Sequence, residues 1–162
     1  MQKIILASQS PRRSQLLQWA DVPFDVVVSE TDESYNPSDS FTQVAMHIAR
    51  NKAWAVIEKN GAGRPVLAAD TIVVCNDTII GKPNDREEAI SFLKTLSGTT
   101  HTVITGVVIL HEGRETAFAD ETKVEFHQLT TDQITYYVDK YQPYDKAGAY
   151  AIQEWIGVVG IR

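Results

Sequence analysis

The chain has 162 residues, of which 43% are apolar and 22% are charged. These proportions are close to those of an ordinary globular protein and argue against a disordered chain. The formal net charge of -6 argues against binding of nucleic acid through bulk electrostatics. An anionic ligand would therefore need a local cluster of Arg and Lys side chains.

The single cysteine, Cys75, cannot form an internal disulfide and suits a reducing compartment. It lies in an apolar run, which predicts a buried strand residue rather than a nucleophile. The first apolar run, residues 4–7, is too short for a signal peptide or a membrane span. The sequence therefore predicts a cytoplasmic protein with no membrane contact.

The first half of the chain alternates predicted strands and helices. A buried strand over residues 4–7 precedes a helix that starts with Ser10 as N-cap and Pro11 at the first helical position. Leu16, Leu17 and Ala20 give this helix an apolar face. A strand over residues 22–28, an acidic loop over 30–40 and a helix over 40–59 follow.

The second half is dominated by predicted hairpins. Strands over residues 66–74 and 78–80 flank a turn at Asn76-Asp77, and Asp85 caps a helix that ends near residue 96. Two long strands, 103–110 and 115–126, surround Glu112-Gly113, and a helix over 131–140 precedes a Gly-rich tail. The pattern predicts a mixed α/β domain rather than a doubly wound sheet.

A cluster of hydroxyls and cations stands between the first strand and the first helix, in SQSPRR (8–13). A helix N-terminus offers free N–H groups and partial positive charge, and guanidinium groups bind phosphate with forked hydrogen bonds. Two cations at a helix N-terminus are otherwise unfavourable. The segment therefore favours a polyphosphate site formed by Ser8, Ser10, Arg12 and Arg13 over a simple solvated first turn.

Asp70 lies inside an apolar strand, AADTIVV (68–74). A carboxylate in such a place is costly unless it is paired, hydrogen-bonded or bound to metal. The sequence alone leaves two interpretations of Asp70 open. It is either a functional acid or an Asp at a strand edge that is hydrogen-bonded to the backbone.

Three further segments are weaker signals when each is taken alone. Lys82, in GKP (81–83), is either presented from a rigid loop or is an ordinary surface cation. His101, in SGTTHTVITG (97–106), is more typical of a structural hydrogen bond than of a base. Gln153 lies at the end of DKAGAYAIQ (145–153), and its amide can both donate and accept hydrogen bonds, which suits recognition of the edge of a base. The alternative interpretation is that this segment is a packed loop with a surface ion pair.

Taken in order, these five segments resemble the Maf family of nucleoside triphosphate pyrophosphatases, and the resemblance covers nearly the whole chain. It implies a single domain over residues 1–162, with a mixed sheet similar to that of inosine triphosphate pyrophosphatases and two lobes around a central cleft. It implies hydrolysis of a nucleoside triphosphate to the monophosphate and pyrophosphate. The sequence DKAGAYAIQ resembles that of the family branch that acts on dTTP and UTP. This resemblance implies a house-cleaning role toward modified nucleotides.

The resemblance also assigns roles to residues. Asp70 is expected to be the proton acceptor and, with Glu30, to bind a divalent cation, Mg²⁺ or Mn²⁺. Phosphates are expected on Ser8, Ser10, Arg12, Arg13, Lys52 and Lys82, and base specificity on Arg12, Thr71 and Gln153. The family further implies a homodimer.

One departure and four alternatives accompany this interpretation. Family members continue with a segment resembling GxYxNVxGLP that residues 157–161 do not match, so a truncated C-terminus is expected. The alternatives are the branch acting on 7-methyl-GTP or a pyrophosphatase of broad specificity, a nucleotide-binding regulator of cell division, and a plain structural domain.

Overall fold

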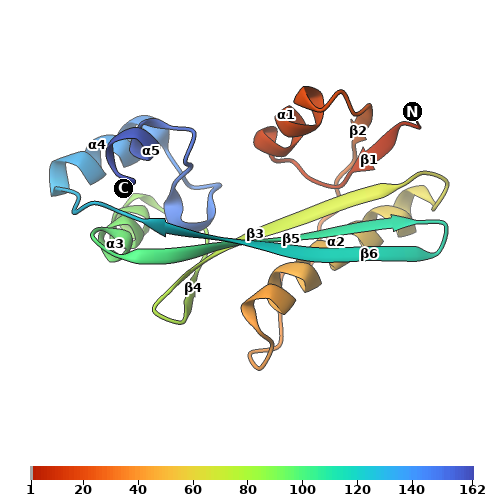
Figure 1. Cartoon of the computed structure of the whole chain (residues 1–162), viewed down its shortest axis with the longest axis horizontal. Coiled ribbons are helices and arrows are strands. Elements are labelled where there is room, and N and C mark those ends of the chain that lie inside the picture. Colours follow the sequence, from red (N-terminus) through yellow and green to blue (C-terminus); the bar gives the residue numbers. More distant parts are fainter. Residues whose placement is uncertain (1) are drawn as a thin grey trace. The chain divides into compact units, whose positions relative to one another are not determined.

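The computed structural model describes residues 2–162 and divides them into two compact units (Figure 1). Unit 1 comprises the chain up to Asp70 together with Thr105–Asp120, and unit 2 comprises Thr71–Ile104 together with Glu121–Arg162. Three strands contribute residues to both units, namely β3 (Val66–Cys75), β5 (Thr100–His111) and β6 (Arg114–Glu125).

The strands form a mixed sheet in the order β2-β1-β3-β5-β6. Strand β1 (Ile4–Leu6) pairs in parallel with β2 (Phe24–Val26) on one side and with β3 on the other. Strand β4 (Thr78–Ile80) pairs antiparallel with β3. The prediction of a mixed α/β sheet is confirmed, although β2 is shorter than the strand expected over residues 22–28.

The core of unit 1 lies between its strands and helix α2 (Phe41–Asn60). Ser40 caps this helix in a reciprocal capping box with Gln43, as its sequence favours. The helix reaches the sheet closely at Gly106, where any Cβ would lie 2.4 Å from the main-chain carbon of Ala45. The buried cluster that results comprises Ile5, Ala7, Ala49, Ala53, Val56, Val66, Ala68, Val108 and Leu110.

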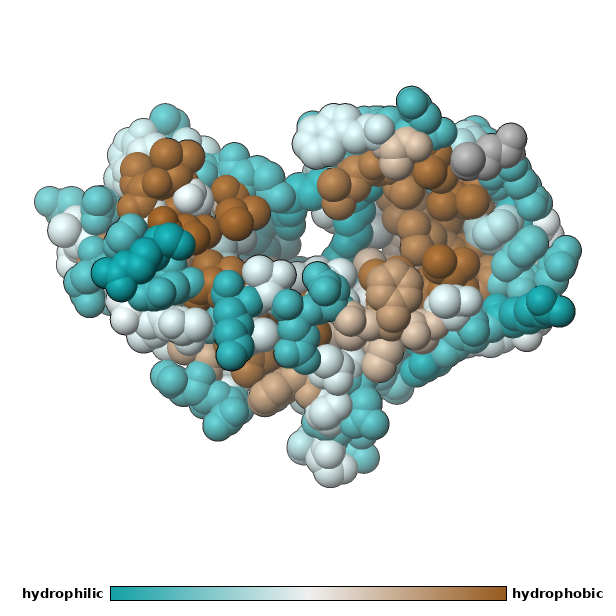
Figure 2. Space-filling model, viewed as in Figure 1, coloured by the Kyte–Doolittle hydropathy of each residue, from teal (hydrophilic) through white to brown (hydrophobic). Residues whose placement is uncertain are grey.

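Helix α1 (Pro11–Trp19) follows β1 and begins after Ser10, as predicted. In α1, all of whose residues the structure describes, none is buried. Leu16 and Trp19 are 59% and 71% exposed, and Val26 of β2 is 49% exposed. Figure 2 shows apolar surface over this part of unit 1. The apolar face predicted for this helix is therefore present, but it is not packed into the core of unit 1.

Unit 2 packs its helices around a second core. Helix α3 (Arg86–Leu96) is capped by the Asp85 carboxylate, which accepts from the Glu88 N–H, and helix α4 (Thr131–Tyr141) is capped by Thr130. The tail adds a short 3₁₀ turn (Ala147–Ala149) and helix α5 (Trp155–Val159), which the sequence pattern did not predict.

Two hairpin turns match their predictions. Residues Asn76 and Asp77 join β3 to β4 with φ values of 49° and 56°. Glu112 and Gly113 join β5 to β6 with φ values of 50° and 74°. Two successive residues with positive φ give the turn whose twist suits an antiparallel pair.

Candidate active site

Asp70 ends the first segment of unit 1 and is 9% exposed in the middle of β3. The Lys52 ammonium, from the middle of α2, donates to Asp70 Oδ1 at 2.6 Å. Lys52 stands between Ala49 and Ala53, which are buried against the sheet, so the helix face that packs on β3 also directs this cation toward the carboxylate. The costly carboxylate in the apolar strand is therefore paired with a cation, rather than bonded only to backbone at a strand edge.

A second carboxylate shares the same ammonium. Lys52 Nζ lies 2.9 Å from Glu33 Oε1, and Glu33 belongs to the acidic loop that follows β2. Burial acts to lower the pKa of Lys52, but the charges and hydrogen bonds of Asp70 and Glu33 outweigh burial, so the pKa lies above its ordinary value. Lys52 therefore stays charged and holds two carboxylates together.

Glu30, the acid that the family resemblance assigns to the metal, is exposed in the same loop. The structure thus draws attention to Glu33, which sequence reasoning did not single out. Both acids stand in a polar stretch without helical or strand periodicity, so spacing gave no means of choosing between them. Only the tertiary contact with Lys52 distinguishes Glu33.

The SQSPRR segment forms a compact cluster at the start of α1. Ser8 is 6% exposed, and its hydroxyl accepts from the Ser10 N–H at 3.2 Å and from Arg13 Nη1 at 2.8 Å. Burial lowers the pKa of Arg13, and the neighbouring charge of Arg12 acts in the same direction, while the charge of Asp70 opposes both. Ser8 therefore orients a partly desolvated guanidinium within the electrostatic reach of Asp70.

Unit 1 thus brings together Ser8, Arg13, Lys52, Asp70 and Glu33 from four segments far apart in the sequence. Arg12 and Ser10 lie at the same helix start and are partly buried. Such a cluster can hold anionic oxygens on its cations while a carboxylate remains available to accept a proton.

The other predicted site residues belong to unit 2. Thr71 follows Asp70 on β3 and is partly buried, whereas Lys82 and Gln153 are exposed on two different loops. Gly148, with φ of 71°, packs so closely on β3 that a Cβ would lie 2.9 Å from Val73 Cγ2.

The Gly148 N–H also donates to the Gly81 carbonyl at 3.0 Å. The loop that carries Gln153 is thereby tied both to the strand of Thr71 and to the loop of Lys82. These three residues stand on segments that contact one another within unit 2.

His101 and Cys75 have the structural roles that the sequence favoured for them. His101 is 2% exposed, and its Nε2 lies 2.7 Å from the Tyr150 hydroxyl, with Phe126 packed edge-on against the ring. Burial lowers the pKa of His101 to about 4. Cys75 is buried in β3. His101 is thus a neutral structural group of unit 2.

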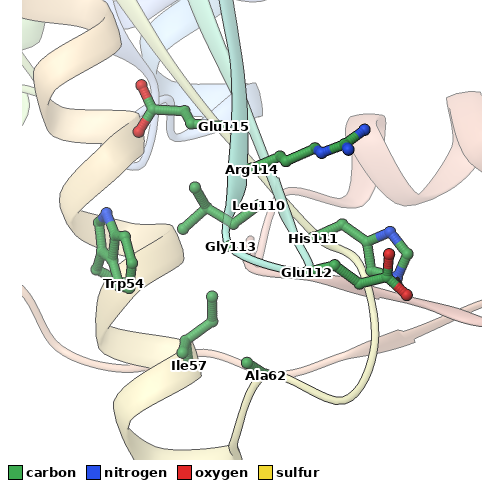
Figure 3. Close-up of a pocket in the computed structure, with 9 residues that line it drawn as sticks. All are labelled: Trp54, Ile57, Ala62, Leu110, His111, Glu112, Gly113, Arg114 and Glu115. Carbon is green, nitrogen blue, oxygen red and sulfur yellow. Dashed lines mark ion pairs between the residues drawn. The ribbon is translucent and has the colours of Figure 1, made fainter.

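A pocket of about 100 Å³ lies elsewhere in unit 1 (Figure 3). Trp54 and Ile57 of α2 form one wall, and the β5–β6 turn around Gly113 forms the other. Sites for drug-sized ligands usually enclose several hundred Å³. None of the predicted site residues is among the described residues that line this pocket, so it carries no part of the candidate site.

Among residues 2–162, no group of three or more His, Cys, Asp and Glu side chains could hold a metal ion. Over the same residues, no helix is long and apolar enough to cross a membrane.

The fold is similar to that of the Ham1 protein of Staphylococcus aureus, with a TM-score of 0.52, 13% identity, and coverage of 77% of this chain and 72% of that one. At this identity the likeness concerns architecture alone. The family described as Maf-like protein matches residues 3–162, and the chain belongs to that family.

Curated relatives support the same assignment. A dTTP/UTP pyrophosphatase of Parabacteroides distasonis is 47% identical over 160 residues, which are 98% of this chain and 83% of that protein. One from Porphyromonas gingivalis is 45% identical over 163 residues, 99% of this chain and 82% of that protein. A third, from Bacillus mycoides, is 48% identical over 153 residues, covering 94% and 80%.

Proposed function

We propose that this protein hydrolyses nucleoside triphosphates to the monophosphate and pyrophosphate, with dTTP and UTP as its preferred substrates. The observation that carries the proposal is the buried Asp70 carboxylate held by Lys52 beside Glu33 and Arg13. Its family relatives named dTTP/UTP pyrophosphatase support the choice of substrate. The same activity toward modified pyrimidine nucleotides would keep them out of nucleic acids.

In the proposed mechanism, Asp70 accepts a proton from the water that attacks the α-phosphate. The attack breaks the bond between the α-phosphorus and the bridging oxygen, and pyrophosphate leaves with the electron pair of that bond. Arg12, Arg13, Lys52 and Lys82 neutralise the charge of the phosphates, and Ser8 and Ser10 add hydrogen bonds. Thr71, Gln153 and Arg12 select the base.

The residues fit a divalent cation, Mg²⁺ or Mn²⁺. Asp70 and Glu33 both place a carboxylate oxygen on a single cation, the Lys52 ammonium. Carboxylate oxygens are the ligands that Mg²⁺ prefers, and such sites commonly use one or two of them together with substrate phosphates. Asp70 with Glu33 or Glu30 would hold the ion, which when bound would polarise phosphate oxygens.

The decisive experiment is an assay of pyrophosphate release from a panel of nucleoside triphosphates, with Mg²⁺, with Mn²⁺ and with EDTA. We expect metal-dependent release from dTTP and UTP and little from ATP or GTP. Release mainly from 7-methyl-GTP would assign the chain to the sister branch. No release from any nucleotide, with nucleotide binding retained, would refute hydrolysis in favour of a binding role.

A cytoplasmic location and a homodimer belong to the same proposal. The first is supported by the single, buried cysteine. The second is supported only by the family resemblance, and sedimentation of the purified protein would test it directly.

A further inference from the structure

The loop that carries Gln153 closes on itself through an ion pair. Lys146 precedes the 3₁₀ turn and Glu154 directly follows Gln153, and Lys146 Nζ lies 3.5 Å from Glu154 Oε1. The side chain of Lys146 is 11% exposed and that of Glu154 is 22% exposed. Lys146 also bonds to the exposed Asp145 at 2.9 Å, so its largely buried side chain links Asp145 to Glu154 at the two ends of the loop.

Tyr137 of α4 contacts this loop at two points. It is 0% exposed, its hydroxyl donates to Glu154 Oε2, and it accepts from the Ala151 N–H at 3.2 Å. Burial raises the pKa of Tyr137, and the hydrogen bond to Glu154 raises it further, so the hydroxyl keeps the proton that it donates. One buried hydroxyl thus holds the residue after Gln153 and the residue two positions before it.

The remaining anchors of the loop explain why this contact matters. Tyr150 is bonded to His101, and Gly148 is bonded to Gly81, so the chain is held up to residue 150. Gln153 itself is exposed. Between Tyr150 and the start of α5, the Glu154 N–H donates to the Ala151 carbonyl at 3.1 Å and closes a turn around Gln153, and Tyr137 holds both ends of this turn through its contacts with Ala151 and Glu154.

We propose that Tyr137 is a positioning residue that acts through Ala151 and Glu154 to hold Gln153 in the orientation in which it contacts the pyrimidine base. The inference rests on the proposed function, in which Gln153 selects the base. Tyr137 touches neither substrate nor phosphate in this scheme. Its loss therefore affects recognition of the base and leaves the chemistry at Asp70 intact.

The test compares Tyr137→Phe with Tyr136→Phe, which removes a hydroxyl from the neighbouring position of α4. Tyr136 is 45% exposed, and its hydroxyl accepts a hydrogen bond from Lys140 Nζ, so it is a matched control. For Tyr137→Phe we expect kcat/KM for dTTP and UTP to fall about tenfold, mostly through KM, as for loss of a hydrogen bond to a charged group. The control should resemble the wild type.

Each substitution is repeated in a Gln153→Ala background. If Tyr137 acts through Gln153, Tyr137→Phe has little further effect on kcat/KM there, because the group that it positions is gone. A merely structural role would lower kcat/KM equally in both backgrounds and would overturn the proposal. Equal values for Tyr137→Phe and Tyr136→Phe would also overturn it.

Thermal unfolding shows whether each variant folds. If Tyr137→Phe does not fold, Glu154→Gln is measured in the same two backgrounds: a loss that depends on Gln153 supports the proposal, and a loss independent of it, or no loss, refutes it. A wild-type protein that hydrolyses no nucleotide would refute the proposed function and this inference together. Selective pyrimidine hydrolysis unaffected by Tyr137→Phe would refute this inference alone.

Discussion

The stability of unit 2 should depend on pH through His101. Burial lowers the pKa of this side chain from 6.5 to about 4, so between these values the unfolded chain binds a proton that the folded chain excludes. The free energy of unfolding therefore falls as the pH falls through this window, and the contribution is fully present above pH 6.5. At about 1.4 kcal/mol per pH unit, the loss amounts to ~3 kcal/mol.

His101→Phe isolates this contribution, because Phe keeps an aromatic ring against Phe126 but cannot titrate. At pH 7 the variant should be less stable by about 1–3 kcal/mol, since the Tyr150 hydroxyl loses its partner. The wild type and the variant should then converge as the pH falls toward 4.5. Urea unfolding monitored by fluorescence at several pH values would measure the difference. A difference that stays constant between pH 7 and pH 4.5 would refute the reasoning.

Three predictions concern individual side chains. Asp70→Asn should lower kcat by about 10²–10⁴-fold with nucleotide binding retained, as for loss of a general base, and near-normal turnover would contradict that role. Glu33→Gln should lower kcat/KM by about 10–100-fold, and by more than Glu30→Gln does. The reverse order in a steady-state assay would show that Glu30, and not Glu33, is the metal ligand. Gly148→Ala should cost about 2–4 kcal/mol of unfolding free energy, because its Cβ would meet Val73 at positive φ. Gly113→Ala, at a φ of 74° with open space around the added Cβ, should cost only about 1–2 kcal/mol by chemical denaturation.

Local sequence signals predicted the fold best where a residue type has one structural use. Asp85 caps α3, and the turns at Asn76-Asp77 and Glu112-Gly113 form as expected. Helix α5 was missed because its five residues, WIGVV, give too little length for helical periodicity to show. The strand expected over residues 22–28 shortens to three residues, since alternation of apolar residues does not by itself supply a pairing partner.

The candidate site was predictable in its residue types but not in its pairings. The apolar strand marked Asp70, yet only the packing of α2 showed Lys52 as its partner. Lys146 was open to interpretation as half of a surface ion pair, and it bonds to the exposed Asp145 at 2.9 Å, but its side chain is largely buried against Glu154. Contacts between residues distant in sequence have no local pattern, so they emerge only from the tertiary structure.

The shared ammonium of Lys52 has a consequence for how this protein meets its substrate. Two carboxylates brought close together would repel each other. A fold that relied on a divalent ion to neutralise them would lose stability whenever the ion was scarce. Here the chain brings its own counter-ion to Asp70 and Glu33. Unit 1 can therefore fold before any nucleotide or metal binds. Removal of divalent ions should abolish hydrolysis without unfolding the protein.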